Sequence, residues 1–132
     1  MQNKRFVILE HDYPELHWDF MIEIGQELLT WKLLEIPQKE KIIEAIYTFP
    51  HRLFYLDYEG EVSQNRGFVK RWDKGYYQEI DSNADRLLLS LHGLKLNGII
   101  ELRRSSINGN SVGNSENELQ KWVFIHYLGI PN

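Results

Sequence analysis

The chain reads HWDFMIEI from His17 to Ile24, and polar and apolar side chains alternate along this stretch. In an extended chain, His17, Asp19 and the other odd positions share one face, and the apolar even positions share the opposite face. A period of two is typical of a half-buried β-strand. Gly25-Gln26 then supplies a tight turn and residues 27–34 a partner strand, so this stretch predicts a β-hairpin.

Short strand-like runs separated by turn signals continue outward from this hairpin. The expected strands cover residues 5–10, 51–58, 67–73, 76–80, 86–91, 96–103 and 122–127. Residues 41–47 suit either a short helix or a strand, and Lys74-Gly75 is expected to form a hairpin turn. Closely spaced strands of this kind predict a mainly β fold, a small closed or partly open β-barrel with at most one or two short helices.

Length and composition indicate one domain over residues 1–132, because 132 residues with 42% apolar side chains suffice for one core. Residues 105–118 are rich in Ser, Asn and Gly and are expected to form a flexible loop. The apolar run at residues 6–9 is too short for a signal-peptide core or a membrane span. We therefore expect a cytoplasmic protein that does not enter a membrane.

The formal net charge of −4 argues against a protein that coats long duplex DNA, since that task needs a basic surface. It leaves room for an enzyme that grips one strand end, for which a few cations suffice. The sequence contains no Cys, so any metal must be held by His, Asp, Glu or backbone oxygen.

The strongest candidate for such a metal site is the set His11, His17 and Asp19. Residues two apart on a strand point the same way, with Cα atoms roughly 6.5–7 Å apart, so His17 and Asp19 can converge on one point. His11 lies just before the preceding turn and can approach that point from the neighbouring strand. Two imidazoles and a carboxylate suit Mn²⁺, Fe²⁺ or Zn²⁺; alternatively, His17 and Asp19 simply form the solvated face of an amphipathic strand.

Two further segments carry side chains that suit phosphate chemistry. His51 is a candidate hydrogen-bond donor or general acid, and Tyr55 a candidate donor to a phosphate oxygen. Arg66 precedes Gly67, which lets the guanidinium and the backbone approach an anion closely. The alternatives are an ordinary surface His with a half-buried Tyr, and a solvated strand edge.

Taken in order, these motifs resemble the 3′-phosphoesterase domain of DNA ligase D, in a short standalone form. The resemblance runs from about residue 5 to 127. Its motifs here are His11, His17-Trp18-Asp19-Phe20, Trp31, the run from His51 to Gly60, Trp72-Asp73-Lys74-Gly75, the run from Leu91 to Gly98, and Trp122 to Ile125.

This resemblance implies a compact β-barrel with the site on a polar inner surface. It implies His11, His17 and Asp19 as ligands of a divalent metal, most commonly Mn²⁺, with Zn²⁺ or another transition metal as alternatives. His51 and Tyr55 would contact the scissile phosphate. The implied activity is removal of a 3′-terminal ribonucleotide or a 3′-phosphate from nucleic acid in DNA repair, with a separately encoded ligase or polymerase as partner.

The sequence departs from the family pattern at cationic positions. Met21 stands where the family has an Arg two residues after the Asp, Glu35 where it has a Lys, and His126 where it has a Lys near the end of the last strand. Met21 and Glu35 therefore leave two phosphate-binding cations absent. Arg66, with Arg52 as the alternative, is expected to replace one of them, and Arg66 is then a catalytic as well as a substrate-binding candidate.

Three functions follow from these observations. The first is a metal-dependent 3′-phosphoesterase acting on nucleic-acid ends. The second is a non-catalytic module that binds a metal and a phosphate, which Met21 and Glu35 favour. The third is a phosphoesterase for a small phosphorylated metabolite, which the acidic net charge favours.

Overall fold

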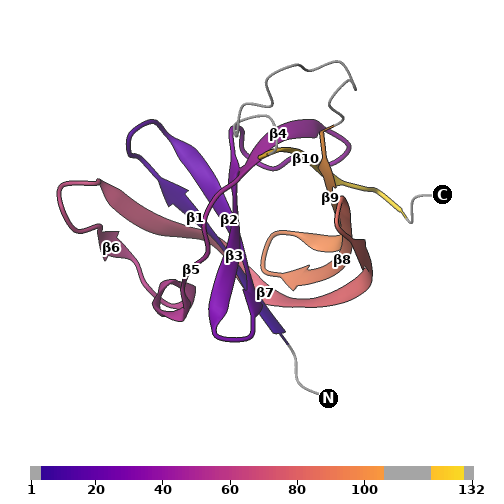
Figure 1. Cartoon of the computed structure of the whole chain (residues 1–132), viewed down its shortest axis with the longest axis horizontal. Coiled ribbons are helices and arrows are strands. Elements are labelled where there is room, and N and C mark those ends of the chain that lie inside the picture. Colours follow the sequence, from indigo (N-terminus) through magenta and orange to yellow (C-terminus); the bar gives the residue numbers. More distant parts are fainter. Residues whose placement is uncertain (1–3, 106–119, 130–132) are drawn as a thin grey trace.

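The computed structural model describes residues 4–105 and 120–129. The elements, in chain order, are the strands β1 (Lys4–His11), β2 (His17–Ile24), β3 (Glu27–Leu33), β4 (Ile42–Tyr47) and β5 (His51–Arg52), the 3₁₀-helix η1 (Leu53–Leu56), and the strands β6 (Gly60–Glu61), β7 (Phe68–Asn83), β8 (Arg86–Gly93), β9 (Asn97–Arg104) and β10 (Lys121–His126). Figure 1 shows the larger strands as a ring, with β5 and β6 to one side of it.

Eight of these strands form a closed antiparallel barrel. Their order is β1-β2-β3-β4-β10-β9-β8-β7, and pairing between β1 and β7 closes the ring. Closure removes the unpaired strand edges that a small open sheet would expose. The barrel expected from the sequence is thus confirmed, with η1 as the one helix among the described residues.

Two apolar clusters lie on opposite sides of β1, β2 and β3. The first fills the barrel, because every strand of the ring contributes alternate residues to it, among them Phe6, Phe20, Trp31, Ile43, Leu89, Ile100 and Phe124. The second lies outside the ring and comprises Val7, Leu9, Met21, Leu28, Leu56, Val62 and Val69. Residues 6–9 are therefore buried on both faces, which explains their unbroken apolar run.

The segment that covers the second cluster runs from the end of β4 to the start of β7. Within it, β5 pairs with β3 and β6 pairs with β7, and η1 buries Leu56 against the outer face of the barrel. Residues 51–58, which the sequence predicts as extended, are therefore a two-residue strand followed by a 3₁₀ turn. The turn arises because Leu56 must face the barrel while Phe54 remains half-exposed.

The prediction of a hairpin turn at Lys74-Gly75 is wrong. Strand β7 runs unbroken for 16 residues, and in Figure 1 it curves from the β6 side around the bottom of the ring. Gly75 lies between Phe6 of β1 and Gly93 of β8. A Cβ atom there would lie 2.0 Å from the carbonyl oxygen of His92, so the glycine serves close strand contact, not a turn.

The sequence left the 41–47 segment ambiguous and predicted a flexible loop at residues 105–118. Residues 42–47 of the ambiguous 41–47 segment form a strand, because they complete the ring between β3 and β10. The flexible loop expected at 105–118 lies, from residue 106, outside the described residues. Within residues 4–105 and 120–129, no helix is long and apolar enough to cross a bilayer.

A buried carboxylate holds the turn between β8 and β9. Asp73 is 1% exposed, and its Oδ1 accepts the backbone N–H groups of Lys74, Leu94 and Lys95, at 2.8, 2.8 and 3.0 Å. Its Oδ2 accepts the backbone N–H of Leu96 at 2.8 Å. Four backbone donors satisfy the buried carboxylate, and three of them belong to the turn, so Asp73 ties the turn to β7.

Replacing Asp73 by Asn should destabilise the fold by about 2–4 kcal/mol, because the amide NH₂ would face backbone donors that it cannot satisfy. Urea unfolding followed by tryptophan fluorescence measures this loss. Asp57→Asn is the matched control, since Asp57 is exposed and its ion pair with Arg5 contributes less than about 1 kcal/mol. Equal stability of the two variants would contradict the role given to Asp73.

Candidate metal centre and phosphate pocket

His11 ends β1, His17 begins β2, and the two residues are paired in the antiparallel register. Asp19 follows two positions later, opposite Leu9. Leu9 belongs to the outer apolar cluster, and hence these three polar side chains lie on the outer face of the barrel. The expectation of a site on the inner surface is wrong, because the interior is filled by apolar residues.

The donor atoms of the triad are close enough to share one ion. His11 Nδ1 lies 3.4 Å from Asp19 Oδ2, and His17 Nε2 lies 3.1 Å from Asp19 Oδ1. One ligand atom from each residue lies within 4.8 Å of the others. Ligands about 2.1 Å from a metal at tetrahedral or right angles lie roughly 3.0–3.4 Å apart, so the geometry is compatible with a divalent metal.

Backbone carbonyl groups hold both imidazoles in place. His17 Nδ1–H donates to the carbonyl of Glu15 at 2.7 Å, and His11 Nε2–H donates to the carbonyl of Arg66 at 2.8 Å. In a neutral ring the nitrogen that faces Asp19 is then unprotonated and can bind a metal, and only in a protonated ring can it donate a hydrogen bond to Asp19. Such outer hydrogen bonds are what orients histidine ligands in metal sites.

The charges inside the triad are strongly coupled. Burial opposes ionisation of Asp19, but the hydrogen bonds from His11 and His17 outweigh burial and hold the pKa of this carboxyl below its usual value. The hydrogen bond to Asp19 in turn raises the pKa of His11 against the opposing effect of burial. A cation bound by the carboxylate would take the place of the protons shared here.

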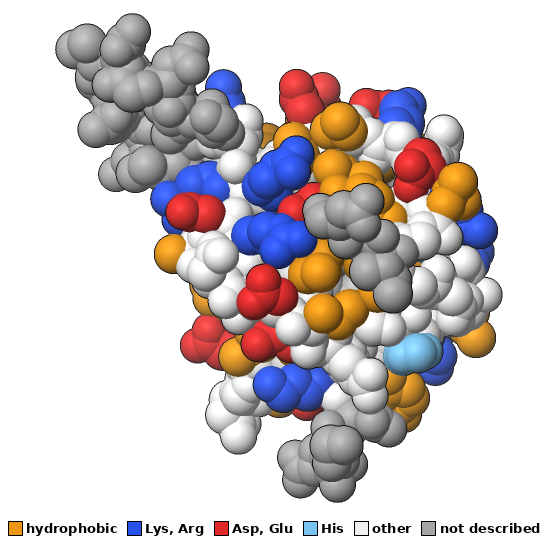
Figure 2. All heavy atoms as spheres, turned by 90° about the vertical axis from the view of Figure 1, so that its right-hand side faces the viewer, with side chains coloured by type: hydrophobic (Ala, Val, Ile, Leu, Met, Phe, Trp, Pro, Cys, Tyr) orange, Lys and Arg blue, Asp and Glu red, His pale blue; other side chains and the backbone are white. Residues whose placement is uncertain are grey.

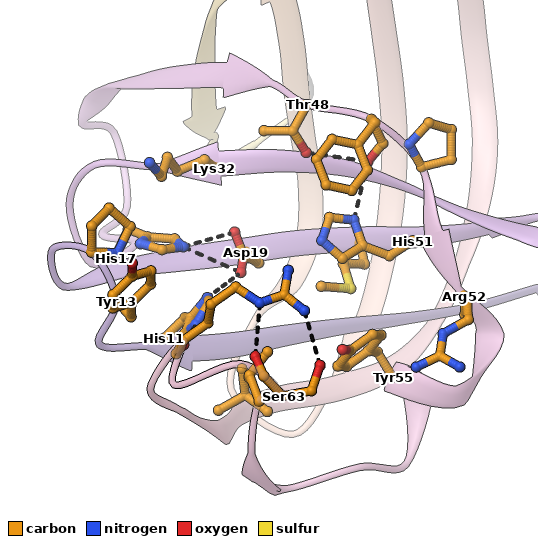
Figure 3. Close-up of a pocket in the computed structure, with 17 residues that line it drawn as sticks. His11, Tyr13, His17, Asp19, Lys32, Thr48, His51, Arg52, Tyr55 and Ser63 are labelled. Carbon is orange, nitrogen blue, oxygen red and sulfur yellow. Dashed lines mark hydrogen bonds and ion pairs between the residues drawn. The ribbon is translucent and has the colours of Figure 1, made fainter.

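The triad lies at one end of a pocket whose other end is formed by His51 and Tyr55 (Figure 3). His51 Nδ1–H donates to the carbonyl of Phe49 at 3.0 Å, and its ring meets that of Tyr55 edge-on at 5.8 Å. Burial lowers the pKa of His51. The imidazole is therefore neutral near pH 7, with its lone pair on Nε2.

Both candidate arginines line this pocket. Arg66 donates from Nε to the Ser63 carbonyl at 2.8 Å and from Nη2 to Ser63 Oγ at 3.0 Å. The Arg52 guanidinium lies over the rings of Phe54 and Tyr55, 5.3 and 5.9 Å from their centroids. Neither arginine forms an ion pair with a carboxylate of the described residues, so both charges remain available to an anion.

Of the three departures from the family pattern, only Met21 touches the pocket. Met21 is buried in the outer apolar cluster. Glu35 forms an ion pair with Lys41 instead, and neither residue lines the pocket. His126 lies on β10 and donates from Nε2 to the Asn97 carbonyl at 2.9 Å, away from the site.

Lys32 is a pocket residue that the sequence analysis missed. It lies directly opposite Asp19 in the pairing of β2 with β3, so the two side chains share the outer face. Figure 3 shows Lys32 on the strand next to Asp19, on the opposite side of the triad from Ser63. With a two-residue turn at Gly25-Gln26, the residue numbers of each pair in the hairpin add up to 51, as for Ile24 and Glu27. The partner of Asp19 is therefore Lys32, and the hairpin predicted from the sequence was enough to identify it.

Comparison with known proteins identifies the family of the chain. The sequence profile of the DNA ligase D 3′-phosphoesterase domain matches residues 9–104. The chain belongs to this family. The match includes the whole triad and all the pocket residues named above.

The curated relatives are much longer proteins. The multifunctional non-homologous end joining protein LigD of Pseudomonas aeruginosa is 30% identical over 115 residues, which cover 80% of this chain and 14% of that protein. LigD of Mycobacterium tuberculosis is 30% identical over 110 residues, which cover 76% of this chain and 14% of that protein. LigD of Mycolicibacterium smegmatis is 28% identical over 114 residues, which cover 73% of this chain and 15% of that protein. The chain thus spans about one seventh of each relative.

Removing one member of the triad should abolish tight metal binding. In His17→Ala and Asp19→Asn, Mn²⁺ affinity measured by calorimetry should fall at least about 100-fold, beyond the 10–100-fold typical of outer-shell changes. His92→Ala is the control, because His92 is an exposed histidine on β8. Wild-type affinity in both triad variants, with unchanged circular dichroism, would contradict the metal assignment.

Proposed function

We propose that this chain is a metal-dependent phosphoesterase that removes a ribonucleotide or a phosphate from the 3′ end of nucleic acid during DNA repair. The observation that carries this proposal is the juxtaposition of the His11, His17 and Asp19 triad with a pocket rich in cations. The charged side chains that line the pocket, apart from the histidines, are Asp19, Lys32, Arg52 and Arg66. Three cations and one carboxylate suit a phosphate group.

The local charge of the pocket differs from that of the whole chain, which carries a net charge of −4. On the opposite side of the molecule, Figure 2 shows acidic and basic side chains interspersed around apolar ones. A face of mixed charge does not attract a long polyanion. This distribution supports recognition of one strand end, and the pocket is where that end would bind.

We infer that the resident metal is Mn²⁺, because two imidazoles and one carboxylate form a mixed donor set that leaves coordination positions open and because the family resemblance implies this ion. When bound, the ion supplies Lewis-acid stabilisation of charge on a non-bridging phosphate oxygen. The protein contributes the rigid placement of the ligands, through the carbonyl groups of Glu15 and Arg66.

His51 is proposed to move the proton. Its Nδ1–H is committed to the carbonyl of Phe49, so Nε2 is the atom that accepts a proton from the water that attacks phosphorus. The bond between phosphorus and the 3′ oxygen of the strand breaks, and phosphate or a nucleoside 5′-monophosphate departs. The resulting imidazolium then donates that proton to the leaving oxygen. This assignment starts from a neutral base, whereas the sequence analysis expected His51 to start as a donor or general acid.

Lys32, Arg66 and Tyr55 are proposed to hold the phosphate. Lys32 approaches from β3 and Arg66 from the opposite wall, between β6 and β7, so they contact different phosphate oxygens. Together they replace the cation that Met21 cannot supply. Tyr55 donates its hydroxyl hydrogen to a third oxygen. The product is a 3′-hydroxyl, the group that a ligase or polymerase needs, which is why such an enzyme is the expected functional partner.

Turnover on defined ends tests the proposal directly. With Mn²⁺, the protein should convert both a 3′-phosphate primer and a primer ending in one ribonucleotide to 3′-hydroxyl products, and EDTA should stop both reactions. Gel electrophoresis of labelled primers measures this. Tight binding of the primers without turnover would instead indicate a binding module, and turnover of small phosphate esters alone would indicate a metabolite phosphoesterase.

Single substitutions of the phosphate-binding cations should each cost roughly ten- to a hundred-fold in kcat/KM. Arg66→Ala leaves the backbone carbonyl that holds His11, and Lys32→Gln leaves the strand pairing, so Mn²⁺ affinity should stay unchanged in both. Met21→Arg should partly restore either variant. Lys121→Gln, an exposed lysine on β10, is the control for loss of one charge. If Arg66→Ala behaves like the wild type, Arg52→Ala tests the alternative cation.

His51→Gln should lower kcat about 10²- to 10⁴-fold, the usual contribution of a general acid–base group, with primer binding retained. Because burial lowers the pKa of His51, the acid limb that it contributes to the pH–rate profile should lie below the ordinary imidazole value of about 6.5. Activity should fall as the pH drops through that limb at saturating Mn²⁺. An unchanged limb in His51→Gln would remove His51 from the proton transfer.

A further inference from the structure

An exposed aromatic ring stands at the rim of the pocket. Phe49 lies between β4 and β5 and is one of the residues that line the pocket, yet its side chain is 72% exposed. Tyr13, which is 43% exposed, also lines the pocket, whereas Phe68 lies outside the lining. Neither the metal triad nor the phosphate contacts proposed above use the Phe49 ring.

Phe49 is held in a defined orientation. Its ring is parallel to that of His51 within 4°, with 5.0 Å between the centroids. The same imidazole donates its Nδ1–H to the backbone carbonyl of Phe49. One face of the phenyl ring therefore rests on His51, and the large exposed fraction shows that much of the rest of the ring is open to solvent. An ordered aromatic face needs little further loss of rotamer freedom to bind a flat partner.

The neighbouring groups indicate which flat partner fits. Pro50 and Arg52 line the pocket on the same segment as Phe49, and Arg52 carries no carboxylate partner among the residues described. An aromatic face and an unpaired arginine in the lining of one pocket are the combination that binds nucleic-acid strands, by base stacking and by contact with phosphates. A phosphorylated metabolite without an aromatic ring would leave Phe49 unused.

Connectivity within a nucleotide links the two features. Base and 3′-phosphate are attached to the same sugar, so a phosphate held between His51 and the triad brings its own base near the ring that covers His51. Stacking on an aromatic side chain does not depend on which base is present, because every base has a π-face. The site would then recognise the presence of a terminal base and not its identity.

We propose that Phe49 is a stacking platform for the nucleobase of the terminal nucleotide whose 3′-phosphate occupies the pocket. The inference rests on the proposed function and specifies it: the substrate class is a nucleic-acid end that carries a base. Phe49 is here a specificity-determining residue, while proton transfer stays with His51.

The test compares two oligonucleotides that end in a 3′-phosphate, one with a normal terminal nucleotide and one with an abasic terminal sugar. Fluorescence anisotropy in EDTA measures their affinities without turnover. Phe49→Ala should weaken binding of the normal end by roughly 5- to 100-fold, leave binding of the abasic end unchanged, and thereby remove the preference for a base. Phe49→Trp should keep the preference, and Phe68→Ala, an exposed aromatic residue outside the pocket, should behave like the wild type.

Two results would overturn the stacking role of Phe49. One is an equal loss of affinity for the normal and the abasic end in Phe49→Ala, which would mean that the ring acts through His51. The other is no loss of affinity for either end. Mn²⁺-dependent turnover of the primers by the wild type would leave the proposed function standing in both cases. Conversely, a base-dependent affinity that Phe49→Ala abolishes, in a protein with no turnover, would support the platform and overturn the phosphoesterase.

Discussion

The alternation of strand β2 is the constraint on which the rest of the structure depends. Even positions such as Phe20 and Ile22 enter the barrel core, and odd positions such as Asp19 and Met21 face the outer layer. A shift of one residue would place a carboxylate in the apolar interior and a phenyl ring in the site, which is energetically prohibitive. The strand that completes the core is for this reason also the strand that places His17 and Asp19, two of the three candidate metal ligands, on the outer face.

A second layer converts the outer face of the barrel into a pocket. The segment between β4 and β7 covers the apolar cluster around Leu9 and Met21 and brings His51, Tyr55 and Arg66 to the triad. The same segment provides the Arg66 carbonyl that orients His11. Apolar packing at one end of this layer thus positions polar groups at the other, which allows a site on the outside of a barrel to be both ordered and open.

Charge is arranged locally in this protein. The whole chain is acidic, yet three cations and one carboxylate line the pocket besides its histidines. Lys32 owes its place there to strand pairing, opposite Asp19. An anion site needs a cation at a given place in space. In a sheet, a residue on one strand or a residue paired with it on the neighbouring strand can place a cation there.

The sequence by itself determined the β class and the β2–β3 hairpin, because these follow from period-two alternation and from turn signals. Spacing along two adjacent strands also made His11, His17 and Asp19 a candidate triad, and the family resemblance implied that they are metal ligands. It did not reveal that β7 passes straight through Lys74-Gly75, since a glycine at a turn and a glycine under a neighbouring strand have the same local pattern. Only the tertiary structure decided on which face the site lies and which cations reach it. Those properties depend on barrel closure between β1 and β7 and on the covering segment, and contacts between residues more than fifty positions apart leave no periodic signal in a sequence.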